Sequence, residues 1–380
     1  MEVGIVSFCS SRDNYGQILQ CWALQETLRR LGHEPFHISY FPARPSKMRQ
    51  FLDAGLVRSV VNRIVNHRQI TLDKSLRAEN ARRNLVRDFE GFISANLRMS
   101  PLKYDSLAGL RNEVPKADAY IAGSDQVWSK LPVTDAERPY YLDFGGKHVR
   151  RIAYAASFGR SSYPHEQVSA LSGLLANFDA VSVREHSGVA ICGQAGRDDA
   201  VVALDPTLLL NGADYQSLGL KQTEAGPYAF IYSVNVDSPD QMDWKRVKDF
   251  ARRSGYGIKA VTASGHIPGR ELFDDAGYLY PTIPEWIGLI KDASIVFTSS
   301  FHGVVFSLLM HRNFVFYPVH GRYSGGNGRV ESLMKLLSLE NHIWKEGLSY
   351  DELPQPDWEL VDAALEEARK ASLDFLKDNL

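Results

Sequence analysis

The chain has 380 residues, with 43 Lys and Arg against 45 Asp and Glu, and its formal net charge is -2. This balance gives no general attraction to nucleic acid or to anionic lipid, so we expect no nucleic-acid partner. Hydrophobic residues make up 44% of the chain, which is also too long for one ordinary core. We therefore expect a globular protein of two domains.

The cysteines and the apolar runs bear on the cellular compartment. Cys9, Cys21 and Cys192 are an odd number without metal-ligand spacing, so we expect buried apolar residues in a reducing compartment. Residues 1–6 are predicted as a first strand, because they lack the basic start and long apolar stretch of a signal peptide. No run approaches the roughly 20 apolar residues of a membrane helix. We expect a cytoplasmic protein, with peripheral contact at the inner face of the membrane if its substrate is lipid-linked.

The first predicted unit is βαβ. A strand at 3–8 leads through a polar loop to an amphipathic helix and then to a strand at 36–40, which places the loop at the carboxyl edge of a parallel sheet. Asn14, Tyr15 and Gln17 are therefore candidate binding residues, although turn and cap chemistry explains the same residue types. The loop lacks the glycine-rich dinucleotide fingerprint, so we expect no nicotinamide cofactor.

A helical insertion at about 45–115 is predicted next, because residues 45–97 are rich in Arg, Asn and Leu and have no strong strand. Four arginines form a basic face on one of its helices: Arg77, Arg82, Arg83 and Arg87. Such a face is either solvated or in contact with an acidic saccharide or a lipid phosphate.

Two later strands end in charged residues. The apolar strand at 119–122 runs into Ser124 and Asp125, an arrangement with which α/β enzymes present an acid or base, although Asp125 can also cap its own turn. A further strand ends at Arg184. Its guanidinium can grip a carboxylate or phosphate, or can pair with Glu185 or another acid.

The alternation of strands and helices then stops and restarts. The polar segment at 211–227 is the predicted linker, so the first Rossmann-like domain covers 1–210 and the second covers 228–345. Residues 346–380 carry a last helix, which we expect to return to the first domain. The predicted fold class is thus α/β, with two Rossmann-like domains. The carboxyl ends of the strands in both sheets are expected to face a central cleft between the domains.

The stretch at 292–303 is the centre of the predicted site, because its apolar run at 295–297 is predicted as a buried strand that turns directly into a helix. Ser299 and Ser300 are candidate N-caps, and His302 and Gly303 fall in the first helical turn. In open α/β sheets ligands lie beyond the carboxyl ends of the strands, where free N–H groups favour an anion. His302 can reach a bound substrate there, or it can simply fill the turn.

The glycine-rich stretch at 320–329 carries two guanidinium groups, those of Arg322 and Arg329. A mobile loop of this composition can close over an anion through its N–H groups and arginines, or it can be a plain connector.

Six motifs in chain order resemble those of the polysaccharide pyruvyl transferase family over nearly the whole chain. They are Asn14-Tyr15-Gly16, Gly123-Ser124-Asp125-Gln126-Val127-Trp128, Tyr154-Ala155-Ala156-Ser157-Phe158-Gly159, Ser182-Val183-Arg184-Glu185, Leu204-Asp205-Pro206-Thr207 and Ser300-Phe301-His302-Gly303, with Arg329 ahead of Ser332 and Leu333. One departure stands out, since members of the family often carry Arg two places before the histidine, where this chain has Ser300. By chemistry, Arg329 or Arg322 is the expected substitute.

The resemblance implies a fold similar to that of GT-B glycosyltransferases, phosphoenolpyruvate as donor and a sugar diol as acceptor. The family positions that match are Asp125, Arg184 and His302. The product expected from this resemblance is a pyruvate ketal on a saccharide or lipid-linked saccharide, a precursor of a surface or capsular polysaccharide.

The expected mechanism gives each residue a role. Phosphoenolpyruvate carries about three negative charges, which Arg184, Arg329 and the helix start at 300–303 would bind. His302 would give and take a proton, and Asp125 would orient it or activate the acceptor hydroxyl. No cluster has metal-ligand spacing, so we expect neither metal nor cofactor. A nucleotide-sugar-dependent glycosyltransferase and a catalytically inactive saccharide-binding relative are the alternatives.

Overall fold

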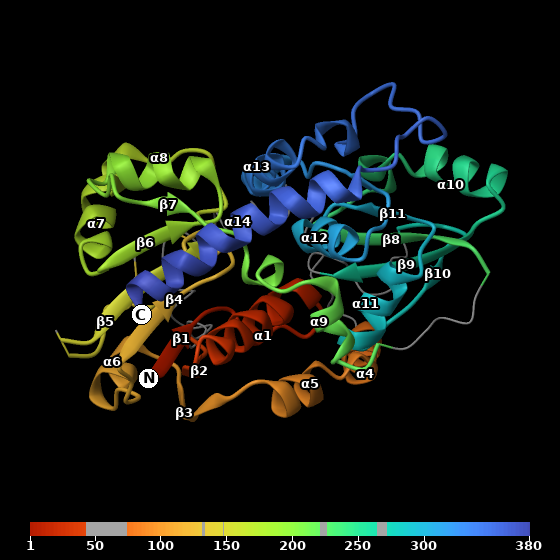
Figure 1. Ribbon diagram of the computed structural model, residues 1–380. Coiled ribbons are helices and arrows are strands. Elements are labelled where there is room, and N and C mark those ends of the chain that lie inside the picture. Colours follow the sequence, from red (N-terminus) through yellow and green to blue (C-terminus); the bar gives the residue numbers. More distant parts are fainter. Residues whose placement is uncertain (43–73, 131–133, 147, 221–225, 264–271) are drawn as a thin grey trace.

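The computed structural model describes residues 1–42, 74–130, 134–146, 148–220, 226–263 and 272–380. Two parallel sheets lie side by side, with helices on their faces, and the long C-terminal helix crosses from one to the other (Figure 1). The predicted α/β class with two Rossmann-like halves is therefore confirmed.

The N-terminal sheet has seven strands in the order β3-β2-β1-β4-β5-β6-β7, and neighbouring strands pair in parallel. Its strands are β1 (Glu2–Val6), β2 (Glu34–Tyr40), β3 (Met99–Tyr104), β4 (Ala119–Ala122), β5 (Arg150–Ala156), β6 (Ala180–Val183) and β7 (Val201–Val202). The strand order reverses between β1 and β4, which makes the carboxyl ends of these two strands a topological switch point.

The C-terminal sheet has five parallel strands in the order β10-β9-β8-β11-β12. They are β8 (Tyr228–Val234), β9 (Gly257–Ala263), β10 (Gly277–Tyr278), β11 (Ile295–Thr298) and β12 (Phe314–Phe316). Here the order reverses between β8 and β11, so the second switch point lies where β11 leads to His302.

The helices that cover the sheets are α1 (Tyr15–Arg30), α4 (Lys74–Arg87), α5 (Phe89–Asn96), α6 (Leu107–Asn112), α7 (His165–Leu175), α8 (His186–Gln194), α9 (Gly212–Gln216), α10 (Trp244–Arg253), α11 (Ile283–Lys291), α12 (Phe301–Leu309), α13 (Gly328–Leu336) and α14 (Trp358–Asn379). Short 3-10 helices interrupt the loops, among them η4 (Gly321–Gly326). None of the helices in the described ranges combines the length and the apolar character that a membrane crossing requires.

The two domains share a hydrophobic core at the N-terminal end of α1. The Tyr15 ring is fully buried and stacks on Trp286 of α11 with 5.1 Å between ring centres. Its hydroxyl donates a hydrogen bond of 2.7 Å to the main-chain oxygen of Pro281. Aromatic pairs of this kind contribute about 0.5–1.5 kcal/mol beyond their burial. The start of α1 is therefore held against the C-terminal domain.

Helix α14 joins the domains a second time. Near its start, Trp358 stacks on His311 of the C-terminal domain, with 4.8 Å between ring centres. Near its end, the Ser372 hydroxyl accepts a hydrogen bond of 3.0 Å from the main-chain nitrogen of Leu204 in the N-terminal domain. Figure 1 shows the helix spanning both halves.

Three details of the predicted organisation are wrong. The insertion at about 45–115 contains β3, an edge strand of the N-terminal sheet, which was not predicted because its alternating pattern is weak. Residues 45–73 of the insertion lie outside the described ranges. The linker at 211–227 contains α9, which Asn211 starts with a capping box. The glycine-rich stretch at 320–329 forms η4 and the start of α13 instead of an open loop.

The basic face on α4 is in part an interdomain contact. Arg87 is buried and donates to the main-chain oxygen of Thr262 at 2.9 Å, and the Arg83 guanidinium lies 4.7 Å from the centre of the Tyr280 ring. These two arginines therefore pack against the C-terminal domain, while Arg82 is exposed. Cys9, Cys21 and Cys192 are all buried, as expected.

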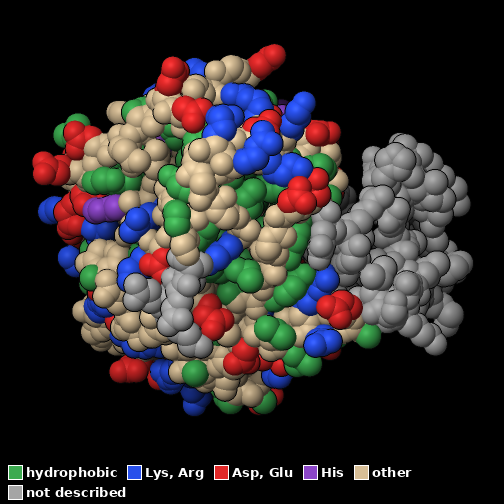
Figure 2. All heavy atoms as spheres, turned by 90° about the vertical axis from the view of Figure 1, so that its right-hand side faces the viewer, with side chains coloured by type: hydrophobic (Ala, Val, Ile, Leu, Met, Phe, Trp, Pro, Cys, Tyr) green, Lys and Arg blue, Asp and Glu red, His purple; other side chains and the backbone are tan. Residues whose placement is uncertain are grey.

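Basic side chains on the surface of α10 form ion pairs with acidic side chains. Figure 2 shows Lys and Arg clustered on one face beside acidic side chains. On α10, Lys248 contacts Asp274 at 2.7 Å and Arg253 contacts Asp351 at 2.7 Å. Exposed pairs of this type contribute little to stability, but they cancel the local positive charge.

Candidate functional site

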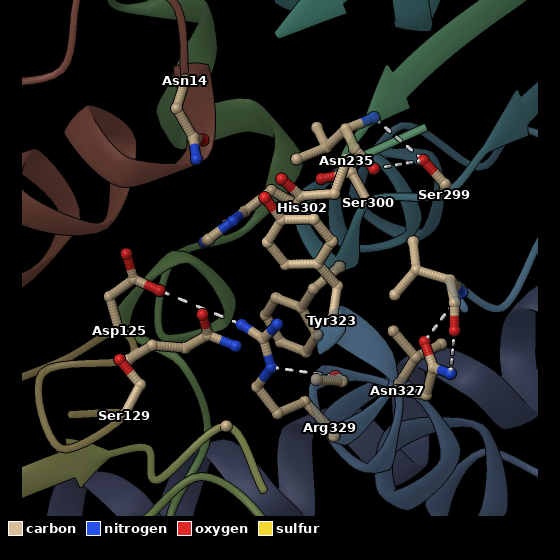
Figure 3. A pocket seen from close by; sticks show the side chains of 18 of the residues that line it. Asn14, Asp125, Ser129, Asn235, Ser299, Ser300, His302, Tyr323, Asn327 and Arg329 are labelled. Atoms are coloured by element: carbon tan, nitrogen blue, oxygen red, sulfur yellow. Dashed lines mark hydrogen bonds and ion pairs between the residues drawn. The ribbon is translucent and has the colours of Figure 1, made fainter. Parts of the chain in front are cut away.

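A cavity of about 560 Å³ lies between the domains, where the carboxyl ends of both sheets meet. The walls come from Phe8, Asn14, Gln17, Asp125, Gln126, Ser129, Gly159 and Arg160 of the N-terminal domain and from Val234, Asn235, Ser299, Ser300, Phe301, His302, Phe316, Val319, Tyr323, Gly325, Gly326, Asn327, Arg329 and Val330 of the C-terminal domain. Figure 3 shows Asp125, His302 and Arg329 pointing toward one another across this space from separate elements. Both switch points therefore open into one polar cavity.

His302 reaches the cavity because β11 turns directly into α12. Ser300 occupies the N-cap position, and His302 is the second residue of the helix. The His302 side chain is only 7% exposed, yet it lines the cavity. Gly16 makes the room, since a Cβ at that position would lie 2.0 Å from His302 Cγ. The start of α1 thus fixes the imidazole from the opposite domain.

Gly16→Ala is expected to lower the free energy of unfolding by about 1–3 kcal/mol, because overpacking forces the imidazole or α1 to shift. Urea denaturation measures this change. Gly173→Ala is the matched control, since Gly173 also lies in a helix but a Cβ added there would meet no atom within 4 Å. Alanine there is expected to stabilise the protein by about 0.5–1 kcal/mol. Equal effects of the two substitutions would show that Gly16 does not hold His302 in place.

A buried charge network lies behind the cavity wall. The Arg184 side chain is 1% exposed and donates to Asp125 Oδ1 at 3.1 Å and, by its other amino group, to Asp205 Oδ2. Asp205 also accepts hydrogen bonds from the main-chain nitrogen of Thr207 at 3.0 Å and from its hydroxyl at 2.6 Å. Because buried charges are costly unless they are paired, these contacts explain why Arg184 can be enclosed.

The imidazole of His302 lies beside this network. Its Nε2 is 3.6 Å from Asp205 Oδ1, beyond ordinary hydrogen-bond length, and it has no hydrogen-bond partner among the described residues. We predicted that Asp125 either orients His302 or activates the acceptor hydroxyl, and in the described part of the chain the carboxylate within ion-pair distance of the imidazole is that of Asp205. Asp125 instead accepts from Gln17 at 3.3 Å and from Arg184. Asp205 therefore lies on the side of the imidazole that faces the buried network, whereas Asp125 lines the cavity.

Electrostatics keep both aspartates ionised. Burial opposes ionisation of Asp125, but the charges of Arg184, His302 and Arg329 hold its pKa below the usual range. Burial also opposes ionisation of Asp205, whose pKa is nevertheless held far below its usual range by His302 and Arg184. In contrast, burial and then Arg184 lower the pKa of Arg329 to about 10. Arg329 remains a cation at neutral pH.

Arg329 is one of the cations at the cavity surface. It is the second residue of α13, its Nε donates to Gly326 oxygen at 3.1 Å, and its Nη1 lies 3.9 Å from Asp125 Oδ1. The guanidinium carbon is 5.7 Å from the centre of the Phe301 ring. The main chain of Arg322 lies in η4, but its side chain is outside the described part of the structure.

The predicted site residues divide into two groups. His302, Asp125, Arg329, Ser300, Asn14 and Gln17 line the cavity, whereas Arg184, Ser124, Gly303 and Tyr15 do not. Arg184 is enclosed by its carboxylates, and Tyr15 fills the interdomain core. The Ser124 hydroxyl donates to Ala155 oxygen at 2.8 Å and to Asp205 at 3.3 Å. A Cβ on Gly303 would lie 2.1 Å from Thr298 Oγ1. These four residues therefore have packing or supporting contacts in place of the predicted contact with substrate.

Sequence reasoning missed Asp205 and Arg160 as site residues. Asp205 belongs to one of the six motifs, but the motif alone gave it no role in the predicted site. Arg160 directly follows Gly159, the last residue of another motif, and lines the cavity. The exit of a strand at the carboxyl edge was the signal that could have identified Arg160.

Comparison with solved structures supports the fold. The UDP-GlcNAc 2-epimerase from Neisseria meningitidis, solved with UDP-GlcNAc bound, is 8% identical, with a TM-score of 0.50 and coverage of 100% of both chains. An alpha-glucosyltransferase in complex with UDP and a 13-mer DNA is 10% identical, with a TM-score of 0.49 and coverage of 100% of this chain and 95% of its own. At 8% identity, the likeness to the epimerase concerns the fold alone, which is of the GT-B type.

Comparison with sequences gives the family. No protein of curated function matches the chain. The model of the family described as polysaccharide pyruvyl transferase matches residues 14–321, well over half of the chain. This range contains the six motifs and the cavity-lining residues from Asn14 to Val319, and Arg329 lies shortly beyond it. The chain belongs to the polysaccharide pyruvyl transferase family, a family of transferases.

Proposed function

We propose that this protein transfers the pyruvate group of phosphoenolpyruvate to two hydroxyls of a saccharide, forming a pyruvate ketal. The observation that carries this proposal is the meeting of His302, Asp125 and Arg329 at one cavity between the domains. The acceptor is a saccharide or a lipid-linked saccharide, a precursor of a surface or capsular polysaccharide. The reaction belongs to the cytoplasm, at the inner face of the membrane when the acceptor is lipid-linked.

The cavity has the charge that the donor requires. Phosphoenolpyruvate carries a carboxylate and a phosphate, about three negative charges near neutrality. Arg329 supplies a guanidinium at the cavity surface. Two helices, α1 and α12, begin at the cavity with Asn14 and Ser300 as their N-cap residues, and the N-terminal end of a helix favours an anion.

His302 is the group we assign to proton transfer. As imidazolium it gives a proton to the methylene carbon of the donor, and a sugar hydroxyl attacks the central carbon. The neutral imidazole then takes the proton of that hydroxyl. Loss of phosphate lets the second hydroxyl attack the same carbon, and its proton leaves with the phosphate. The donor and diol become ketal and inorganic phosphate, with no metal or cofactor required by this chemistry.

The carboxylates have separate roles in this scheme. Asp205, 3.6 Å from His302 Nε2, stabilises the imidazolium and is a positioning residue. Asp125 is ionised and lines the cavity, so it can accept a hydrogen bond from an acceptor hydroxyl and raise its nucleophilicity. Arg184 keeps both carboxylates in place.

Arg329→Met is expected to raise the KM for phosphoenolpyruvate about 10- to 100-fold. This change corresponds to the loss of one charge-assisted hydrogen bond, which contributes about 1.5–3 kcal/mol. Steady-state kinetics with varied donor measure this change. Arg252→Met removes a charge from an 80% exposed side chain on α10 and is the matched control. An unchanged KM in the Arg329 variant would remove this residue from donor binding.

The function itself is tested by phosphate release from phosphoenolpyruvate with a panel of diol sugars and lipid-linked saccharides. Phosphate release that depends on acceptor, together with a ketal methyl signal in the product, supports the proposal. Binding of a uridine diphosphate sugar with no binding of phosphoenolpyruvate would instead indicate a glycosyltransferase. Binding of saccharide without phosphate release at any acceptor would indicate an inactive relative.

A further inference from the structure

Arg160 is a cationic residue of the cavity wall, and none of the described carboxylates forms an ion pair with it. It follows Gly159 beyond the end of β5 and lines the cavity. One of its amino groups donates to the main-chain oxygen of Ser129, and the guanidinium carbon lies 5.7 Å from the centre of the Tyr163 ring. Its Nε is buried and makes no hydrogen bond to a described residue. A guanidinium is always charged, so a site next to an open cavity leaves it able to bind an anion.

The charge of Arg160 makes the net charge of the described cavity-lining residues positive. The lining residues with fixed charge are Asp125, Arg160 and Arg329 in the described part of the chain. Asp125 offsets one guanidinium, and Arg160 therefore supplies the excess positive charge before any proton on His302 is counted. Arg184 adds no accessible charge, because two buried carboxylates enclose it.

Arg160 and Arg329 border the same pair of glycines. A Cβ on Gly325 would lie 2.9 Å from Arg160 Cα, and a Cβ on Gly326 would lie 2.8 Å from Arg329 Nη2. The side-chain amide of Gln126 lies close to both segments, since it would be 2.7 Å from a Cβ on Gly159 and 3.2 Å from one on Gly326. The close approach of η4 to the exit of β5 thus places the main chain of Arg160 beside η4, which precedes Arg329 in the chain, and both arginines line the cavity.

We propose that Arg160 is a second donor-binding residue, which holds the anionic donor together with Arg329. This inference rests on the proposed function and supplies a guanidinium that Ser300, two places before His302, does not provide. The donor has two anionic groups, and Arg160 and Arg329, one from each domain, supply two guanidinium groups to the lining of one cavity, which matches that number. Both domains then contribute a guanidinium group to the donor site.

Titration calorimetry of phosphoenolpyruvate into the full chain, without acceptor, tests this role. Arg160→Met is expected to weaken donor binding about 10- to 100-fold, the value of one charge-assisted hydrogen bond. Arg160→Lys keeps the charge and a donor for the Ser129 oxygen but loses the planar fork, so it is expected to weaken binding about threefold or more, and less than Met does. Arg252→Met, on the exposed surface of α10, is expected to bind as the parent protein does.

The outcomes separate this inference from the proposed function. If the parent protein binds the donor and both Arg160 variants bind it equally well, the role of Arg160 is overturned while the proposed function stands. If the parent protein binds no phosphoenolpyruvate, both are overturned. Thermal unfolding checks that Arg160→Met is folded, and if it is not, the Lys variant decides. A fall in kcat at saturating donor, with KM unchanged, would also contradict a binding role.

Discussion

His302→Gln is expected to lower kcat for pyruvyl transfer about 100- to 10,000-fold, the usual contribution of general acid or base catalysis. Glutamine has nearly the volume of histidine and can form hydrogen bonds, but it neither gives nor takes a proton near neutral pH. The side chain is only 7% exposed and packs against Gly16, so a close isostere avoids the cavity that alanine would leave. Steady-state kinetics at saturating donor and acceptor measure the loss.

His311→Gln is the control for this variant. His311 is a 47% exposed histidine whose Nε2 lies 3.0 Å from Asp362, and it is not among the cavity-lining residues. We expect its kcat to stay within about twofold of the parent value, since exposed pairs contribute about 0–1 kcal/mol. Turnover of His302→Gln equal to that of the control would exclude His302 from proton transfer.

The largest effect on stability is expected for Asp205→Asn, about 3–5 kcal/mol of unfolding free energy, because it leaves Arg184 buried with one carboxylate fewer. The Asp205 carboxylate is fully enclosed and accepts from Arg184 and Thr207. Urea denaturation at neutral pH measures the loss. Asp351→Asn breaks an exposed pair with Arg253 and is expected to cost about 0–1 kcal/mol.

The effect of Asp205→Asn has a predictable pH dependence. The pKa of Asp205 in the folded protein is held below its unfolded value, so its ionisation favours folding above the unfolded pKa of about 3.9. This contribution is lost as the pH falls through the folded pKa. The difference between the parent protein and Asp205→Asn should therefore be constant near neutrality and should shrink as the pH falls below about 4. A difference that grows with acid would contradict this assignment.

Local patterns in the sequence were sufficient to predict much of the fold. Buried parallel strands such as β4 and β11 appear as short apolar runs, and the helix after β11 begins at a serine, a residue type typical of the N-cap position. Asp125 and His302 follow strands of different sheets, and they could be assigned to one cleft because two Rossmann-like domains were expected to face it with the carboxyl ends of their strands. The weak edge strand β3 and the short helix α9 escaped this reasoning, since their patterns are too short to distinguish them from loops.

The α/β architecture and the strand exits that carry the chemistry therefore follow from local sequence patterns. Which charged groups are accessible follows from the three-dimensional arrangement instead. Arg184 and Arg160 both follow strands of the same sheet, but Asp205 and Asp125 enclose the first, whereas no described carboxylate pairs with the second. The physical reason is that the charge of a guanidinium is local, while its neutralisation depends on partners that the chain brings from distant positions.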